Sequence, residues 1–250
     1  MFSVTDAREL TDQAPEGIAV IDLALPEHNA WHAGALEAFA LELTSQANTR
    51  KWRALIISGG EDSHFCSGTA ADADRSLVAL TRLARIYSQA FSALRRYPGL
   101  IVAAINGAAS DEGLALALCC DFRVSSPAAE FGFSPMGRNR IPMGGSTQLL
   151  PRLVGESLAK RMMLCGHRLN AEQALACGLV DEVAASDQRQ DLLTRSVALV
   201  APSCDHDPVV VHGVRQLIEH ARMRPLETGF AAERDWQATL ADMQKDLGGH

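Results

Sequence analysis

The sequence contains no pair of cysteines in a CxxC spacing, although six cysteines are scattered along it. Zinc ribbons and thioredoxin-like redox centres use such pairs, so neither is predicted and no metal site is expected. Cys119 and Cys120 lie in an apolar run, where buried free thiols are expected. The cysteine pattern as a whole is typical of a reducing compartment.

The sequence also lacks a net positive charge, long apolar runs and nucleotide-binding loops. The 250 residues carry a formal net charge of −7, which disfavours binding to nucleic acid or to anionic membranes. No run reaches the roughly 18 apolar residues of a membrane span, and the N-terminus lacks the regions of a signal peptide. No Walker loop or GxGxxG motif occurs, so neither nucleotide hydrolysis nor dinucleotide redox chemistry is predicted. We therefore expect a cytoplasmic protein.

Strand-like and helix-like segments alternate along the chain, and the apolar fraction of 47% is ordinary for a globular protein. β-Branched runs predict strands, and apolar residues at spacings of three and four predict helices. The expected strands are 17–23, 53–58, 100–105 and 122–125, and the expected helices are 33–46, 77–96 and 113–120. This order favours an α/β fold with crossover helices over residues 1–200. Residues 201–250 are expected to form a helical oligomerisation segment after a hinge at Pro202 to Pro208.

Four motifs occur in a fixed order along the predicted α/β region. They are Leu25 to Ala30, Phe65 to Gly68 with nearby Asp72, Ile105 to Asp121, and Ile141 to Gln148. Together they resemble the landmarks of the enoyl-CoA hydratase/isomerase (crotonase) superfamily. The resemblance implies a spiral of ββα units, an acyl-CoA substrate, no cofactor apart from the coenzyme A of that substrate, and a homotrimer or dimer of trimers.

The resemblance also implies positions for the site. Backbone N–H groups of Ser67 and Glu112 would form an oxyanion hole for the thioester carbonyl as it becomes an enolate. His28 stands where relatives often place a basic residue near the nucleotide phosphates of coenzyme A. The positions expected to bind substrate are His28, Ala30, Phe65, Gly68, Ala70, Asp72, Pro135, Arg138 and Gly144.

Both acids of the family's hydratase mechanism are missing. Counting from the landmarks places Ala115 and Pro135 at the two glutamate positions, and neither residue can exchange a proton. Asp111 and Glu112 stand where relatives have a glycine run, and they are the first candidates for replacement acids. An alternative is that these acids only stabilise the start of a helix.

Three functions remain open from the sequence. The first is a lyase or isomerase that acts on acyl-CoA through an oxyanion-stabilised enolate with a non-standard acid/base set. The second is a decarboxylase or carbon–carbon hydrolase, in which Arg138 or Arg140 holds a second carboxylate. The third is a noncatalytic acyl-CoA-binding subunit. His64, a lone histidine on a loop, is expected to be solvated.

Overall fold

A computed structural model describes residues 2–70, 76–134, 141–221 and 223–247. The chain divides into two compact units, residues 1–201 and residues 202–250. The first unit is a mixed α/β fold, as the sequence predicted, and the second consists of helices. Three positions expected to bind substrate, Asp72, Pro135 and Arg138, lie outside the described residues, as does Arg140.

The main sheet of the first unit has the strand order β1-β2-β3-β5-β7-β10. Its strands are β1 (Phe2–Asp6), β2 (Ile18–Leu23), β3 (Ala54–Ser58), β5 (Leu100–Ile105), β7 (Phe122–Ser125) and β10 (Glu182–Val183). β1 is antiparallel to β2, and the other neighbours are parallel, with Ile56 paired to both Val20 and Val102. The four predicted strands are present, whereas β1 was not expected. Its apolar residues Phe2 and Val4, which pack against the core, alternate with Ser3 and Thr5, and this short period of two was a signal for the strand.

A second, smaller sheet has the order β4-β6-β8-β9. Its strands are β4 (His64–Cys66), β6 (Ala108–Ser110), β8 (Glu130–Gly132) and β9 (Leu169–Asn170). The short strands β4, β6 and β8 each follow a long strand of the main sheet, and a helix follows each of them. This arrangement is the repeated ββα unit that the resemblance implied. The strand β6 was not among the strands expected from the sequence.

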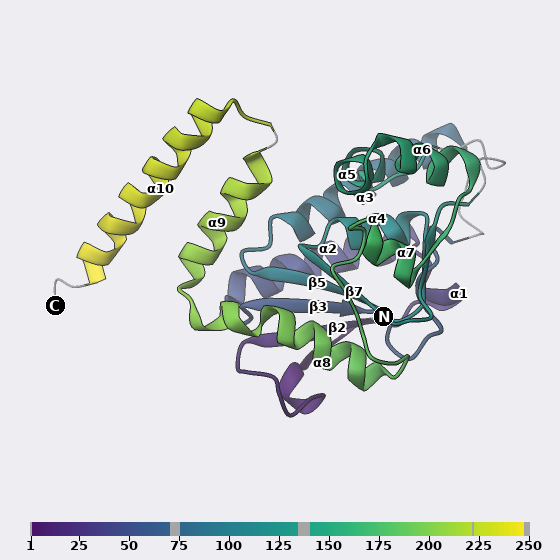
Figure 1. Cartoon of the computed structure of the whole chain (residues 1–250), viewed down its shortest axis with the longest axis horizontal. Helices are drawn as coiled ribbons and strands as arrows, with labels where there is room; N and C mark the ends of the chain where they lie inside the picture. Colours follow the sequence, from purple (N-terminus) through teal and green to yellow (C-terminus); the bar gives the residue numbers. More distant parts are fainter. Residues whose placement is uncertain (1, 71–75, 135–140, 222, 248–250) are drawn as a thin grey trace. The chain divides into compact units, whose positions relative to one another are not determined.

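Helices cover both faces of the main sheet (Figure 1). The helices of the first unit are α1 (Pro26–Asn29), α2 (Ala33–Thr49), α3 (Leu77–Arg95), α4 (Glu112–Leu118), α5 (Ser146–Val154), α6 (Glu156–Cys165), α7 (Ala171–Ala176) and α8 (Arg189–Val200), with a 3-10 turn at Ala7–Glu9. Ala19, Ile21 and Leu23 of β2 share one core with α2 and α3, whereas α8 contacts β3, β5 and β7. Burial on both faces explains why these strands read as continuous apolar runs.

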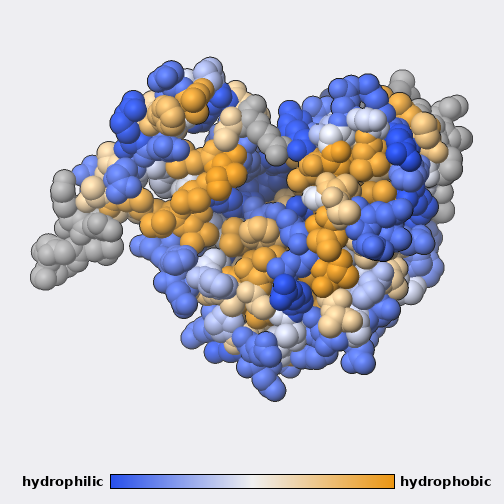
Figure 2. Space-filling view, viewed as in Figure 1, coloured by the Kyte–Doolittle hydropathy of each residue, from blue (hydrophilic) through white to orange (hydrophobic). Residues whose placement is uncertain are grey.

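The second unit contains a 3-10 turn (Ala201–Asp205) and the helices α9 (Pro208–Ala221) and α10 (Leu226–Leu247), which contact each other. Gly213 allows close packing, because a Cβ there would lie 2.9 Å from the ring of Trp236. Val210, Val214 and Ile218 recur every four residues along α9 and are exposed, and Figure 2 shows apolar side chains on the surface of this unit. No described helix is long and apolar enough to cross a membrane.

Candidate active site

The first landmark forms an unusual backbone turn in α1. Residues 27–29 all have positive φ, between 53° and 60°, a conformation that is rare outside glycine. The buried side chain of Asn29 holds this turn from inside. Its Oδ1 accepts a hydrogen bond from Leu25 N–H at 3.0 Å, and its Nδ2 donates to Gly59 O at 2.9 Å and to His64 O at 3.2 Å. Asn29 therefore has a structural role that explains its place in the motif.

This turn uses the backbone amide of Ser67. The Ser67 N–H donates to His28 O at 3.0 Å, so the amide predicted for the oxyanion hole is already engaged within the chain. The assignment of Ser67 to an oxyanion hole stays a prediction. Thr69 pairs with Trp31 in an isolated parallel bridge, in which Trp31 N–H donates to Gly68 O and Trp31 O accepts from Ala70 N–H. In the described part of the chain, the N–H of Thr69 donates no backbone hydrogen bond.

Gly68 lies directly against the start of α4. Its φ is +95°, and a Cβ at this position would lie 2.9 Å from Asp111 Cβ, 3.2 Å from Ser110 O and 3.3 Å from Glu112 N. The absence of a side chain thus allows the segment that follows β4 to approach the first turn of α4. The structure therefore brings Gly68 and Thr69 next to Glu112.

Asp111 has a strained backbone and a well-held carboxylate. Its φ of 51° and ψ of −120° lie in a region that side chains rarely adopt. The carboxylate makes no capping hydrogen bond to α4. It accepts instead from Ser134 N–H at 2.7 Å and from Ser134 Oγ at 2.5 Å. Asp111 therefore links α4 to the segment that follows β8 and does not cap its helix.

The carboxylate of Glu112 is buried, with the residue only 1% exposed. Its Oε2 accepts from Thr69 Oγ1 at 2.8 Å, and its Oε1 lies 3.4 Å from the donating Met143 N–H. Thr69 Oγ1 is also 2.8 Å from the hydroxyl oxygen of Tyr87 on α3. A buried charge is costly unless it is hydrogen-bonded, and these donors supply part of that compensation. The segment after β4, the helix α3 and the segment at Met143 therefore converge on Glu112.

The first missing glutamate position is filled by a methyl group. Ala115 is fully buried, and a Cβ on Gly144 would lie 3.0 Å from Ala115 Cβ and 2.5 Å from the ring of Phe91. Gly144 has a φ of +72°, so two requirements favour glycine there. The described residues at the first acid position thus offer no group for proton transfer. The second position, Pro135, lies outside the described residues.

An open groove lies beside Glu112. It has a volume of about 670 Å³ and is lined by α3 between Leu80 and Ser88 and by residues 141–145. Met143 and Gly144 belong to this lining, which places the groove next to the Met143 N–H that approaches Glu112. The lining is mainly apolar, as is typical of sites for small organic groups.

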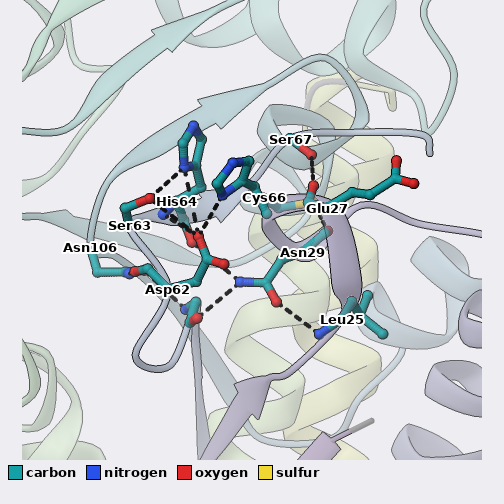
Figure 3. Close-up of polar contacts among 11 residues, drawn as sticks. Leu25, Glu27, Asn29, Asp62, Ser63, His64, Cys66, Ser67 and Asn106 are labelled. Atoms are coloured by element: carbon teal, nitrogen blue, oxygen red, sulfur yellow. Dashed lines mark hydrogen bonds and ion pairs between the residues drawn. The ribbon is translucent and has the colours of Figure 1, made fainter. Parts of the chain in front are cut away.

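The remaining expected binding residues differ in their surroundings. Phe65 is fully buried and Ala30 is 3% exposed, so their side chains belong to the core, whereas Ala70 is partly exposed. His28 lies in the α1 turn with its Nδ1 3.2 Å from Asp62 Oδ1. His64 lies beside the same aspartate (Figure 3). Burial raises the pKa of the Asp62 carboxyl, but the His64 N–H and His28 outweigh it, so the net pKa lies below its ordinary value.

The comparisons with known proteins agree with these landmarks. The family described as enoyl-CoA hydratase/isomerase matches residues 13–247. The chain is 30% identical over 236 residues to 2,3-dehydroadipyl-CoA hydratase of Escherichia coli K12, covering 93% of the chain and 90% of that protein. It is 29% identical over 247 residues to the mitochondrial methylglutaconyl-CoA hydratase of Mus musculus, covering 95% and 77%.

Solved structures show the same similarity. Pseudomonas aeruginosa DspI matches with a TM-score of 0.88 and 30% identity, covering 97% of this chain and 96% of that one. An enoyl-CoA hydratase from Bacillus anthracis matches with a TM-score of 0.86 and 26% identity, covering 99% and 93%. The chain belongs to the enoyl-CoA hydratase/isomerase family, which confirms the resemblance drawn from its motifs.

Proposed function

We propose that this chain binds acyl-CoA thioesters and transfers a proton at the carbon next to the thioester carbonyl, with the carboxylate of Glu112 as the acid/base group. The observation that supports this proposal is the buried position of that carboxylate, beside the Thr69 hydroxyl and the Met143 N–H at the groove. The relatives named above act on CoA thioesters, which supports the substrate class.

In this proposal the oxyanion hole consists of the backbone N–H groups of Thr69 and Glu112. Gly68 lies between them, and its missing Cβ leaves the two backbones in close approach. The Ser67 amide is not used, because it donates to His28 O. Two preorganised donors of this kind contribute several kcal/mol by stabilising the negative oxygen of an enolate in the transition state.

The proposed acid is held by a short chain of hydroxyl groups. The Thr69 hydroxyl carries one hydrogen and donates it to Glu112 Oε2, so the Tyr87 hydroxyl is the donor to Thr69. This arrangement fixes one carboxylate oxygen and leaves Oε1 on the side of Met143. A base positioned in this way and protected from water is suited to removing a proton from carbon.

A single acid/base group, Glu112, supports a reaction other than hydration. Adding water across a double bond requires a group that activates water and a group that protonates carbon. Asp111 does not supply the second group in this geometry, because Ser134 donates to its carboxylate from both N–H and Oγ. We therefore favour isomerase or lyase chemistry over ordinary hydration. The decarboxylase alternative depends on Arg138 or Arg140 and stays a prediction.

Exchange of the α-proton tests the proposal without knowledge of the natural acyl group. The protein is incubated with butyryl-CoA in D₂O, and deuterium at the α-carbon is followed by mass spectrometry. Butyryl-CoA binding is measured in parallel by calorimetry. We expect binding and exchange in the natural chain, and an exchange rate at least about 10²-fold lower in Glu112→Gln with binding retained. Glu156→Gln, which changes an exposed acid on α6, is the matched control and should exchange normally.

Each part of the proposal has its own contrary result. If the chain bound no acyl-CoA, the proposed substrate class would be wrong. Binding without exchange would favour the noncatalytic subunit. Exchange that is unchanged in Glu112→Gln would show that another group moves the proton. Thermal unfolding of each variant separates these results from a loss of folded protein.

We also propose that the helical unit mediates assembly into a homotrimer or a dimer of trimers. The exposed stripe of Val210, Val214 and Ile218 on α9 supports this proposal, since exposed apolar patches commonly mark protein interfaces. Analytical ultracentrifugation at micromolar concentration is the test. A monomer under these conditions would contradict the proposal.

A further inference from the structure

Two histidines and an aspartate converge at the surface of the first unit, outside the contacts of Glu112. His64 Nδ1 lies 3.6 Å from Asp62 Oδ1 (Figure 3). His28 Nδ1 lies 3.2 Å from the same oxygen. The two imidazole rings are stacked, with their centroids 4.1 Å apart. Three candidate ligand atoms of these residues all lie within 4.8 Å of one another.

We propose that His28, Asp62 and His64 bind a divalent transition-metal ion of the Zn²⁺ type through two imidazole nitrogens and one carboxylate oxygen. Zinc takes these ligands at about 2.0–2.2 Å in tetrahedral geometry, which separates neighbouring ligand atoms by about 3.4 Å. The two observed separations, 3.2 and 3.6 Å, lie on either side of that value. Because the two imidazole rings are stacked at 29°, they have to turn so that both nitrogens point at one ion.

The backbone holds each of the three ligands in place. His28 has a φ of 60°, and its carbonyl accepts from Ser67 N–H at 3.0 Å. The side chain of Asp62 accepts from His64 N–H at 2.9 Å, and its carbonyl accepts from Asn106 Nδ2 at 2.7 Å. Two loops are thereby fixed against each other before any ion binds. Such preorganisation lowers the cost of assembling a metal site.

The surroundings of the cluster also suit a metal ion. The side chains of His28, Asp62 and His64 are 58%, 30% and 33% exposed, so a water molecule can take the fourth position. Imidazole ligands favour zinc, copper and nickel over magnesium or calcium. One competing contact exists, because Ser63 Oγ lies 2.9 Å from His64 Nδ1, and the ion would replace it. This site could not be predicted from the sequence, since its ligands follow no metal-binding motif.

Calorimetry with zinc chloride on the untagged, chelator-treated chain tests the site. We expect one strong site per chain in the natural protein. His64→Ala should weaken binding at least about tenfold. His28→Asn should do the same, and asparagine is chosen because it tolerates a positive φ. Ser63→Ala, which removes only the competing hydroxyl, should bind zinc equally well or more tightly.

His206→Ala is the matched control, because His206 is an exposed histidine of the other unit. Its binding should equal that of the natural chain. Thermal unfolding in the presence of chelator must show that every variant is folded. Absence of zinc binding in the natural chain would overturn the proposal. Unchanged binding in the double variant His28→Asn with His64→Ala would also overturn it. Neither result overturns the proposed function, which is tested by acyl-CoA binding and α-proton exchange in the natural chain and in Glu112→Gln. Because His28 is also expected near the phosphates of coenzyme A, the effect of His28→Asn on acyl-CoA binding is measured separately.

Discussion

The strained backbone of Asp111 leads to a prediction that separates conformation from side-chain chemistry. Asp111→Ala and Asp111→Gly remove the same carboxylate and the same hydrogen bonds to Ser134. They differ in that alanine retains a Cβ at φ 51° and ψ −120°, whereas glycine does not. We therefore expect the glycine variant to be more stable than the alanine variant, by more than the preference for glycine over alanine at an ordinary helix N-cap.

The size of the difference follows from two opposing effects. A residue in such a region costs about 1–3 kcal/mol, which glycine avoids. Glycine loses about 0.4–1 kcal/mol through the greater freedom of the unfolded chain. The glycine variant should therefore be more stable by about 0.5–2 kcal/mol. Both variants should be less stable than a chain that keeps the carboxylate and its bonds, by about 1–3 kcal/mol before strain relief is counted.

Urea unfolding followed by tryptophan fluorescence measures this difference, because Trp31 and Trp52 are buried in the first unit. In thermal unfolding, a difference of about 1 kcal/mol in the free energy of unfolding corresponds to a shift of about 2–4 °C in the melting temperature of a protein of this size. Lys160→Ala and Lys160→Gly form the control pair at an exposed position in α6, where alanine should be the more stable. An alanine variant at position 111 as stable as the glycine variant would refute the argument from strain.

Four further predictions follow from the site and the core. Crotonyl-CoA hydration, measured by loss of enoyl absorbance, should be at least about 10²-fold slower than in a relative that keeps both glutamates, and a normal rate would show that another acid reaches the substrate. Gly68→Ala should lower stability by more than about 1 kcal/mol in chemical unfolding and abolish acyl-CoA binding, because the new Cβ meets neighbouring backbone. Tyr97→Phe should cost about 1–2 kcal/mol in the same assay, since Tyr97 donates to Trp52 O at 2.8 Å and burial raises the pKa of its hydroxyl. Iodoacetamide should label exposed Cys165 in the native protein but not Cys66, whose pKa burial raises to about 12, and peptide mass spectrometry would reveal the opposite result.

The long elements were predictable because each carries its own periodic signal. The strand Leu100–Ile105 is wholly apolar, and the helix Leu77–Arg95 repeats apolar residues at spacings of three and four. The strand Ala108–Ser110 carries no such signal, because three small residues cannot show a period. Short strands of the second sheet form because the preceding long strands place them side by side, which is a property of the whole fold.

The site was predictable only in part, for a related reason. Motif spacing located Gly68, Asp111 and Glu112, which the structure brings together. It did not show that the amide of Ser67 donates to His28 O, because that bond depends on the positive φ values of the α1 turn. The contact between His28 and His64 also depends on this turn. A sequence signal for it would require recognition of the turn itself.

The two acids at the start of α4 carry costs that bear on the choice between an enzyme and a binding subunit. Asp111 adopts a backbone conformation that glycine adopts without strain, and Glu112 places a carboxylate where it is 1% exposed. Each feature lowers stability relative to glycine at the same position unless its hydrogen bonds compensate. A subunit that only binds acyl-CoA has no need of a buried acid beside the groove. Departures from the locally preferred residue concentrate at functional sites, and the position of Glu112 therefore favours catalysis over binding alone.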